Sequence, residues 1–343
     1  MAPRIEPVVT RQTSADEVEL LRVMSTDLAG DENARKRATL ILRMLAGETF
    51  RMAFAGAGIT RATARRVLSA YNDNGWQAFV TVMAPRGGDF LARYDQGFWA
   101  ERLVLRCLDK SRDFRAIPYG TSRSEPFTDL AAFRAYRLNE FLLQAWSSGG
   151  RWKRPDLLSI PRQVLREEKG NDTWTPDLKH LANEHCAAYV LKAASAVEVE
   201  TSLWQVKVAL QANVGLSFTV KEEDLESLRN WVNANKVPLY IIQVFYDQAH
   251  VLAFSKLEVL LALPANDPRR IVAEVDPTTN KATFKVPLSE GYLLGSIPEP
   301  DVEGRVFKAP NGRVTVYGRL TGSEIVVSDD KLLERIVNGT LDA

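Results

Sequence analysis

Two short segments of this sequence place carboxylates in the pattern of a β-strand. Asp156 follows a proline and opens the apolar segment 157–160, and Glu198 and Glu200 alternate with valines in the segment 196–200. Because alternate residues of a strand point to one face, Glu198 and Glu200 are expected side by side. Converging carboxylate oxygens are the ligands that Mg²⁺ prefers, and bound Mg²⁺ activates water against a phosphodiester. The pattern therefore predicts Asp156 and Glu198 as Mg²⁺ ligands, with Glu200 as a third catalytic carboxylate.

The pairing of Glu198 with Glu200 itself favours a metal site. Two like charges on a buried strand repel each other and are poorly solvated, so a purely structural sheet would avoid them. A bound dication removes that penalty. The alternative is an edge strand with both glutamates in water, but the mostly apolar residues 193–197 and the helical pattern that follows favour an interior strand.

Two further residues are candidates for the same site. Glu101 falls on one stripe of the predicted helix 94–109 with four apolar residues, so it needs a partner such as a metal cluster or a core arginine. Lys207 lies two helical turns beyond Glu200 and could supply a catalytic cation; otherwise it is a surface lysine of its helix.

A literal search for a Pro-Asp pair followed by Glu-x-Lys selects Glu167-Glu168-Lys169 instead. This segment is polar and leads into the turn signal 170–172, with no strand to display the residues. A second Pro-Asp pair at 176–177 is more typical of a first helical turn. Both remain fallback positions for the site.

The positive charges are concentrated near the N-terminus. The whole chain has a net charge of +1, but residues 33–72 contain eight Lys/Arg and only one acid, Glu48. Such an excess is typical of a surface that contacts phosphates. A solvated basic face without a partner is the alternative.

The same region has the pattern of a helix-turn-helix. Helices are predicted over 15–24, from 31 to Gly47, over 48–55, and from the N-cap Thr60 to Gly75, with the turn 56–59 between the last two. The second helix of this motif enters the major groove by its N-terminal residues. The residues predicted to contact DNA here are Thr60, Arg61, Thr63, Arg65 and Arg66. Many helix pairs only pack together, so the charge pattern carries this prediction. The tail that follows resembles the homeodomain-like unit of transposases.

Beyond a linker at 85–88 the pattern changes, so we predict domains over 1–88 and 89–343. Helices are predicted over 94–109, 130–146, 176–192, 202–213 and 222–233, and strands over 156–160, 196–200, 239–246 and 251–254. Their alternation indicates a mixed α/β sheet flanked by helices. A basic loop, 149–154, adds Lys153 and Arg154 as predicted DNA contacts. From about Asp267 the pattern is mainly β.

Composition excludes several classes of protein. Hydrophobic residues make up 45% and charged residues 25%, which is ordinary for a globular chain. No run approaches 18 apolar residues and no signal-peptide pattern opens the chain, so we expect no membrane partner and a cytoplasmic location. Cys107 and Cys186 match no metal spacing, and three histidines leave little for histidine-based chemistry.

Five segments together resemble the AccI-like type II restriction endonucleases of the PD-(D/E)xK nuclease superfamily. They are YDQGFWAE (94–101), IPYGTSR (117–123), RPDLL (154–158), EVETSLW (198–204) and LSFTVKEEDL (216–225). The resemblance implies a restriction-endonuclease-like fold, Mg²⁺-dependent cleavage of double-stranded DNA at a short specific sequence, a homodimer, and a cognate DNA methyltransferase. The usual pattern of that superfamily has lysine where this chain has Glu200, so the role of Glu200 is open.

Two other functions are compatible with these patterns. One is a non-catalytic helix-turn-helix regulator, in which the carboxylates are structural. The other is a transposase-like recombinase, although its RNase H-type sheet would lack a strand that starts with Pro-Asp.

Overall fold

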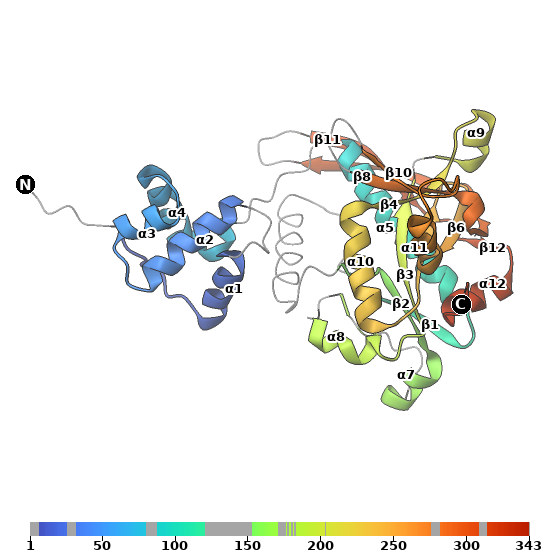
Figure 1. Cartoon of the computed structure of the whole chain (residues 1–343), viewed down its shortest axis with the longest axis horizontal. Coiled ribbons are helices and arrows are strands. Elements are labelled where there is room, and N and C mark those ends of the chain that lie inside the picture. The colour runs from blue at the N-terminus through green and yellow to red at the C-terminus, as the bar shows by residue number, and fades with distance from the viewer. Residues whose placement is uncertain are drawn as a thin grey trace, which may run out of the picture. The chain divides into compact units, whose positions relative to one another are not determined.

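The computed structural model divides into two compact units, one ending at Phe79 and one beginning at Gly88, which are described separately (Figure 1). The described residues are 7–25, 32–79, 88–120, 153–170, 176, 178–179, 181, 183–202, 204–275, 282–308 and 314–342. The predicted helix 130–146 and most of the predicted loop 149–154 lie outside them.

The first unit is helical, and its predicted helices are confirmed. The elements are α1 (Ala15–Ser25), α2 (Glu32–Leu45), α3 (Phe50–Gly56), α4 (Arg61–Asn74) and the 3-10 helix η2 (Gly75–Phe79). Thr60 caps α4 as predicted, because its side chain accepts a hydrogen bond from the Thr63 N–H. Leu21, Ile41 and Tyr71 are fully buried in the core that the helices enclose.

The second unit is built on a mixed sheet of seven strands in the order β1-β2-β3-β5-β6-β9-β12. The strands are β1 (Phe114–Pro118), β2 (Leu157–Pro161), β3 (Ser195–Thr201), β5 (Leu239–Val244), β6 (Gln248–Ala253), β9 (Tyr292–Ser296) and β12 (Val326–Val327). Within this sheet β3 and β5 are parallel, and the other neighbours are antiparallel. The chain between β3 and β5 must therefore cross over the sheet.

Helices cover both faces of this sheet. The helices α5 (Gly88–Leu108) and α12 (Asp330–Val337) share a hydrophobic core with Val197 and Ile242. On the other face, α8 (Asn183–Val190), α10 (Glu222–Asn235) and α11 (Phe254–Ala262) pack with Ala196 and Ile241. The period-two alternation of β3 and β5 thus divides the side chains between two cores. The predicted mixed α/β fold is confirmed at this level.

The remaining elements surround this framework. They are α7 (Arg162–Lys169), α9 (Val206–Gln211), the small sheet β4-β8-β7 (Ser217–Lys221, Ala282–Pro287, Ala273–Val275), η3 (Leu288–Glu290), and the hairpin β10-β11 (Asp301–Lys308, Val314–Thr321). The β-rich pattern after residue 267 is confirmed, although α12 was not predicted. The segment 166–172, predicted as polar chain leading into a turn, begins as the last part of α7 before Gly170 adopts the left-handed conformation.

Candidate active site

The strand pairing brings Asp156 to the two glutamates of β3. Leu157 lies opposite Val197 in the antiparallel pair β2-β3, and the ladder stops there. Beyond this point the side chain of Asp156, the residue before β2, supplies the contact with β3: its Oδ2 accepts a hydrogen bond from the Val199 N–H at 2.8 Å. The Pro-Asp strand start therefore fixes Asp156 beside the segment that carries Glu198 and Glu200.

Strand β3 lies in the interior of the sheet, between β2 and β5, as the sequence predicted. The Glu198 side chain is buried and that of Glu200 is half-buried, which excludes the alternative of two glutamates on a solvated edge. Glu198 Oε1 is bound by the ammonium of Lys153, which also lies 3.1 Å from Asp224 Oδ2 in the first turn of α10. Three chain segments, namely residues 153–156, β3 and α10, thus contribute charge to one cluster.

The other oxygen of Glu198 is unusual. Oε2 is buried and has no hydrogen-bond partner among the described residues. A buried carboxylate oxygen without a donor is costly, since it has lost water and gained nothing in its place. This atom needs a proton or a cation.

The electrostatics of the three predicted catalytic carboxylates point in one direction. Burial raises the pKa of Glu198 well above its usual range, and the Asp156 carboxylate raises it further. Burial, followed by repulsion from Glu101, raises the pKa of Asp156 to about 8. Burial also raises the pKa of Glu200, although Lys153 opposes it. The cluster carries more negative charge than its surroundings stabilise.

Lys153 is the main positive charge of the cluster. Burial lowers the pKa of its ammonium, but Glu198, then Glu200, Asp224 and Asp156, outweigh that effect and raise the pKa well above its usual range. Lys153 therefore stays charged. The sequence predicted it as a DNA contact, whereas the structure places it against carboxylates.

These residues fit a divalent cation in chemistry, though not as a closed coordination shell. The donors are hard carboxylate oxygens, and Glu198 Oε2 is a buried acceptor with a free lone pair. Within the described part of the chain, however, no three His, Cys, Asp or Glu side chains already converge closely enough to hold a metal ion.

Glu101 and Lys207 end up in different places. Glu101, on α5, lies 3.8 Å from Lys179 Nζ and close enough to Asp156 to raise its pKa. Lys207 is exposed on α9, where its backbone N–H bonds Asp247. Among the described residues its side chain forms no ion pair with the carboxylates.

Arg154, the other predicted DNA contact of the second unit, has partners different from those of Lys153. Arg154 is buried, donates hydrogen bonds to the carbonyls of Leu178 and Leu181, and lies over the Tyr119 ring. These contacts do not support the predicted phosphate contact, because the guanidinium is already satisfied. In the fallback segment, Glu167 is exposed on the helix α7. The side chains of Glu168 and Lys169 and all of Asp177 lie outside the described residues.

Two residues near the cluster were not predicted from the sequence. A Cβ at Gly120 would lie 2.9 Å from Asp156 Cα and 3.0 Å from its Oδ1, so any residue other than glycine would displace Asp156. Asp224 belongs to an acidic first helical turn, which is typical of many helices and carried no signal of its own.

Gln243 is a third residue that was not predicted. It lies on β5 in register with Glu200 and is fully buried. Its Oε1 accepts hydrogen bonds from Thr219 N and Oγ1, both at 3.1 Å, which assigns the amide orientation because a backbone N–H can only donate. Its Nε2 is left without a partner in the described structure.

The predicted DNA contacts of the first unit lie on one helix. Arg61, Arg65 and Arg66 of α4 are exposed and form no ion pair within the described residues. By contrast, Arg43 of α2 binds Glu48 at 2.9 Å. The positive charge of α4 is therefore available to a partner.

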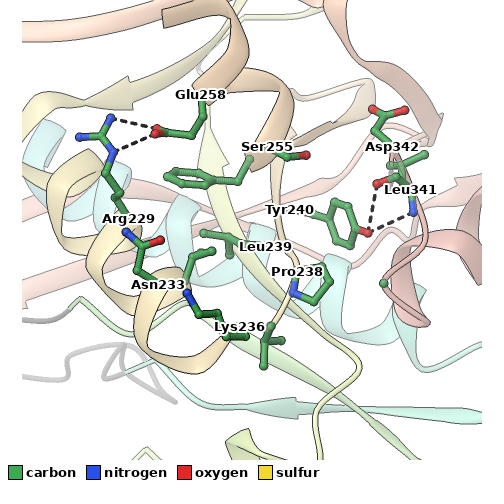
Figure 2. A pocket seen from close by; sticks show the side chains of 14 residues that line it. Arg229, Asn233, Lys236, Pro238, Leu239, Tyr240, Ser255, Glu258, Leu341 and Asp342 are labelled. Carbon is green, nitrogen blue, oxygen red and sulfur yellow. Dashed lines mark hydrogen bonds and ion pairs between the residues drawn. The ribbon is translucent and has the colours of Figure 1, made fainter. Parts of the chain in front are cut away.

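A separate pocket of about 470 Å³ lies at the other end of β5, between α10, α11 and residues near the C-terminus (Figure 2). Arg229 and Glu258, which both line the pocket, form an ion pair with 2.8 Å between Nε and Oε2. Tyr240 exchanges hydrogen bonds with the backbone of Leu341. None of the predicted catalytic residues lines this pocket.

Residues 205–338 match the family model described as AccI restriction endonuclease. This match confirms the resemblance seen in the sequence: residues 205–338 are similar to the AccI restriction endonucleases. The matched range begins after Glu200 and includes Asp224. No curated protein and no solved structure gives a match. No helix of the described residues is long and apolar enough to cross a membrane.

Proposed function

We propose that this protein is a Mg²⁺-dependent type II restriction endonuclease that cuts double-stranded DNA at a short specific sequence. The observation that carries the proposal is the convergence of Asp156 and Glu198, with an unpartnered buried oxygen on Glu198, in a chain whose C-terminal part matches a restriction endonuclease family. The fold is then a PD-(D/E)xK sheet in which β2 and β3 carry the motif.

Each residue has a separate task in this proposal. Asp156, held by the Val199 N–H, and Glu198, held by Lys153, present oxygens to the metal. Bound Mg²⁺ would lower the pKa of a water molecule and neutralise charge on the scissile phosphate. Glu200, half-buried with a raised pKa, would accept a proton from the attacking water. Glu101 adds negative charge beside Asp156 and helps to hold the metal region.

The first unit is proposed to bind DNA through a helix-turn-helix formed by α3 and α4. Arginines 61, 65 and 66 support this role, because they are exposed and form no ion pair among the described residues, and positive charge on one helix attracts the phosphate backbone. A homodimer follows as part of the proposal, since one carboxylate site hydrolyses one strand at a time. A cognate methyltransferase would protect the host's own copies of the site.

The same unpaired arginines also favour the second candidate, a non-catalytic DNA-binding regulator. Incubating the protein with plasmid DNA and Mg²⁺, with EDTA as the control, separates the candidates. We expect discrete bands in Mg²⁺ alone, and sequencing their ends would give the recognition site and the stagger. Bound but intact plasmid would identify a regulator, and joined products would identify a recombinase; either result would refute the nuclease proposal.

A further inference from the structure

The carboxylate cluster contains a lysine that reaches it from outside strand β3. Lys153 precedes Asp156 by three residues, and its ammonium bridges Glu198 Oε1 and Asp224 Oδ2. Its side chain is 31% exposed, so part of it still faces solvent while the cluster holds the ammonium. Lys207, the alternative source of a catalytic cation, is exposed on α9 away from these contacts.

Lys153 does not bind both oxygens of Glu198 in the described structure. It binds one oxygen of Glu198 and leaves Oε2 without a partner, while Asp156 Oδ2 is bound by a backbone N–H. Glu198 and Asp156 would hold the metal in the proposed function, and Lys153 already contacts Glu198, so its ammonium would be close to a phosphate bound at that metal. A preformed positive charge at that place stabilises the negative charge that develops on the phosphate oxygens during hydrolysis.

We propose that Lys153 is the catalytic lysine of this enzyme, supplied from the segment before β2 instead of the strand position that Glu200 occupies. This inference rests on the proposed nuclease function. It leads to two expectations. First, Lys153 acts on the cleavage step more than on DNA binding. Second, Lys153 and the metal both bind Glu198, so the two cations repel each other.

The test uses the full chain with Lys153→Met, which keeps the length of the side chain and removes the charge, and Lys153→Arg, which keeps the charge. At saturating Mg²⁺ and DNA, we expect the single-turnover cleavage rate of Lys153→Met to fall by about 100-fold. DNA affinity measured with Ca²⁺ in place of Mg²⁺ should fall by less than about tenfold. Lys153→Arg should recover part of the rate. Lys331→Ala, which removes an exposed lysine of α12, is the matched control for loss of one charge.

A second readout needs no cleavage. Calorimetric titration of the DNA-free protein with Mg²⁺ should show tighter binding by Lys153→Met, by about tenfold or more, because the competing cation is gone. If Lys153→Met does not fold, the double variant Lys153→Met with Asp224→Asn is used in both measurements instead, because it removes both charges of the Lys153–Asp224 ion pair.

The possible results separate this inference from the proposed function. Cleavage by Lys153→Met within about threefold of wild type would overturn the inference, as would a loss of DNA affinity equal to the loss of rate, which indicates a simple phosphate contact. Weaker Mg²⁺ binding would show that Lys153 only holds Glu198 in place. If the wild-type protein does not cut DNA at all, the nuclease proposal fails, and the Lys153 role fails with it.

Discussion

The two units of this protein hold their functional charges in opposite ways. On α4, three arginines are exposed and have no carboxylate partner among the described residues. In the second unit, Lys153 lies between Glu198 and Asp224, and the cluster's charges are largely removed from water. Exposed charges cost little and act additively on a polyanion, whereas buried charges depend on a few particular partners. Substitutions in the two units should therefore have different consequences.

The largest effect is expected at the metal ligands. Asp156→Ala and Glu198→Ala should each reduce cleavage by at least about 1,000-fold while specific DNA binding persists, because a hard metal ligand is lost and a repulsive charge near phosphate is removed. Plasmid cleavage and gel-shift assays measure the two properties.

Glu167→Ala is the control for this experiment, since Glu167 is exposed on α7 and belongs to the competing Glu-x-Lys match. Near wild-type cutting by either Asp156→Ala or Glu198→Ala would show that the active site lies elsewhere in the chain. Loss of cutting by Glu167→Ala would indicate where it lies.

Glu200→Lys tests whether this strand position needs a carboxylate. The change restores the usual superfamily pattern, but it places a new cation near Lys153 and Lys221, whose charges now favour the ionised Glu200. We expect activity to fall by about 100-fold and not to recover in Mn²⁺, because the carboxylate-rich geometry is lost with the charge.

Lys207→Ala is the companion measurement to Glu200→Lys. An active Glu200→Lys enzyme would show that Glu200 only substitutes for the usual lysine. If Lys207→Ala is inactive yet folded and bound to DNA, the catalytic cation comes from α9 and not from Lys153.

The double substitution Arg61→Ala with Arg65→Ala tests the first unit. DNA affinity should fall, and the log–log dependence of affinity on salt should become shallower by about one unit for each phosphate that the variant no longer neutralises. Arg43→Ala is the matched control, because Arg43 is already paired with Glu48. If the affinity and the slope are both unchanged in the double variant, the basic face of α4 does not contact DNA.

The smallest effect concerns stability without metal. The pKa of Asp156 is raised in the folded protein from its usual 3.8 to about 8, so the protonated carboxyl favours the fold. Stability from this group is complete below its unfolded pKa and declines as pH rises from about 4 to about 8. Asp156→Asn lacks this titration, so its Tm in EDTA should fall by roughly 10 °C less than that of wild type over this range.

The control for the stability measurement is Asp267→Asn. Asp267 is half-buried, and its hydrogen bonds with Arg269 lower its pKa, so it is already ionised across most of this range. Parallel melting curves for wild type and Asp156→Asn at every pH would contradict the raised pKa of Asp156.

Local patterns predicted a large part of this protein correctly. Thr60 as an N-cap and the amphipathic helices of the first unit depend on residues a few positions apart, so neighbouring sequence is sufficient. The same holds for the strand that carries Glu198 and Glu200, whose apolar flanks predicted an interior position. The helix α12 has a signal of this kind too, in four buried apolar residues at helical spacing, although a mainly β pattern was predicted for its region.

The partners within the site could not be predicted in this way. Lys153 was assigned to DNA from the basic composition of its loop, and Arg154 with it, yet one binds carboxylates and the other two buried carbonyls. Lys207 was favoured because it follows Glu200 closely in sequence. Nearness in sequence says little here, because α9 directs Lys207 into solvent.

By itself, the sequence determined which residues could do the chemistry: a Pro-Asp strand start, two glutamates on one face of a strand, and a basic helix. Periodicity and capping act within a few residues, so they survive in the linear chain. Only the tertiary structure decided which charges meet. It set Asp156 against Val199, Lys153 between Glu198 and Asp224, and Gly120 where any Cβ would displace Asp156. The pairing of β2 with β3 and the crossover to α10 bring these residues together, and burial gives each of those contacts its strength.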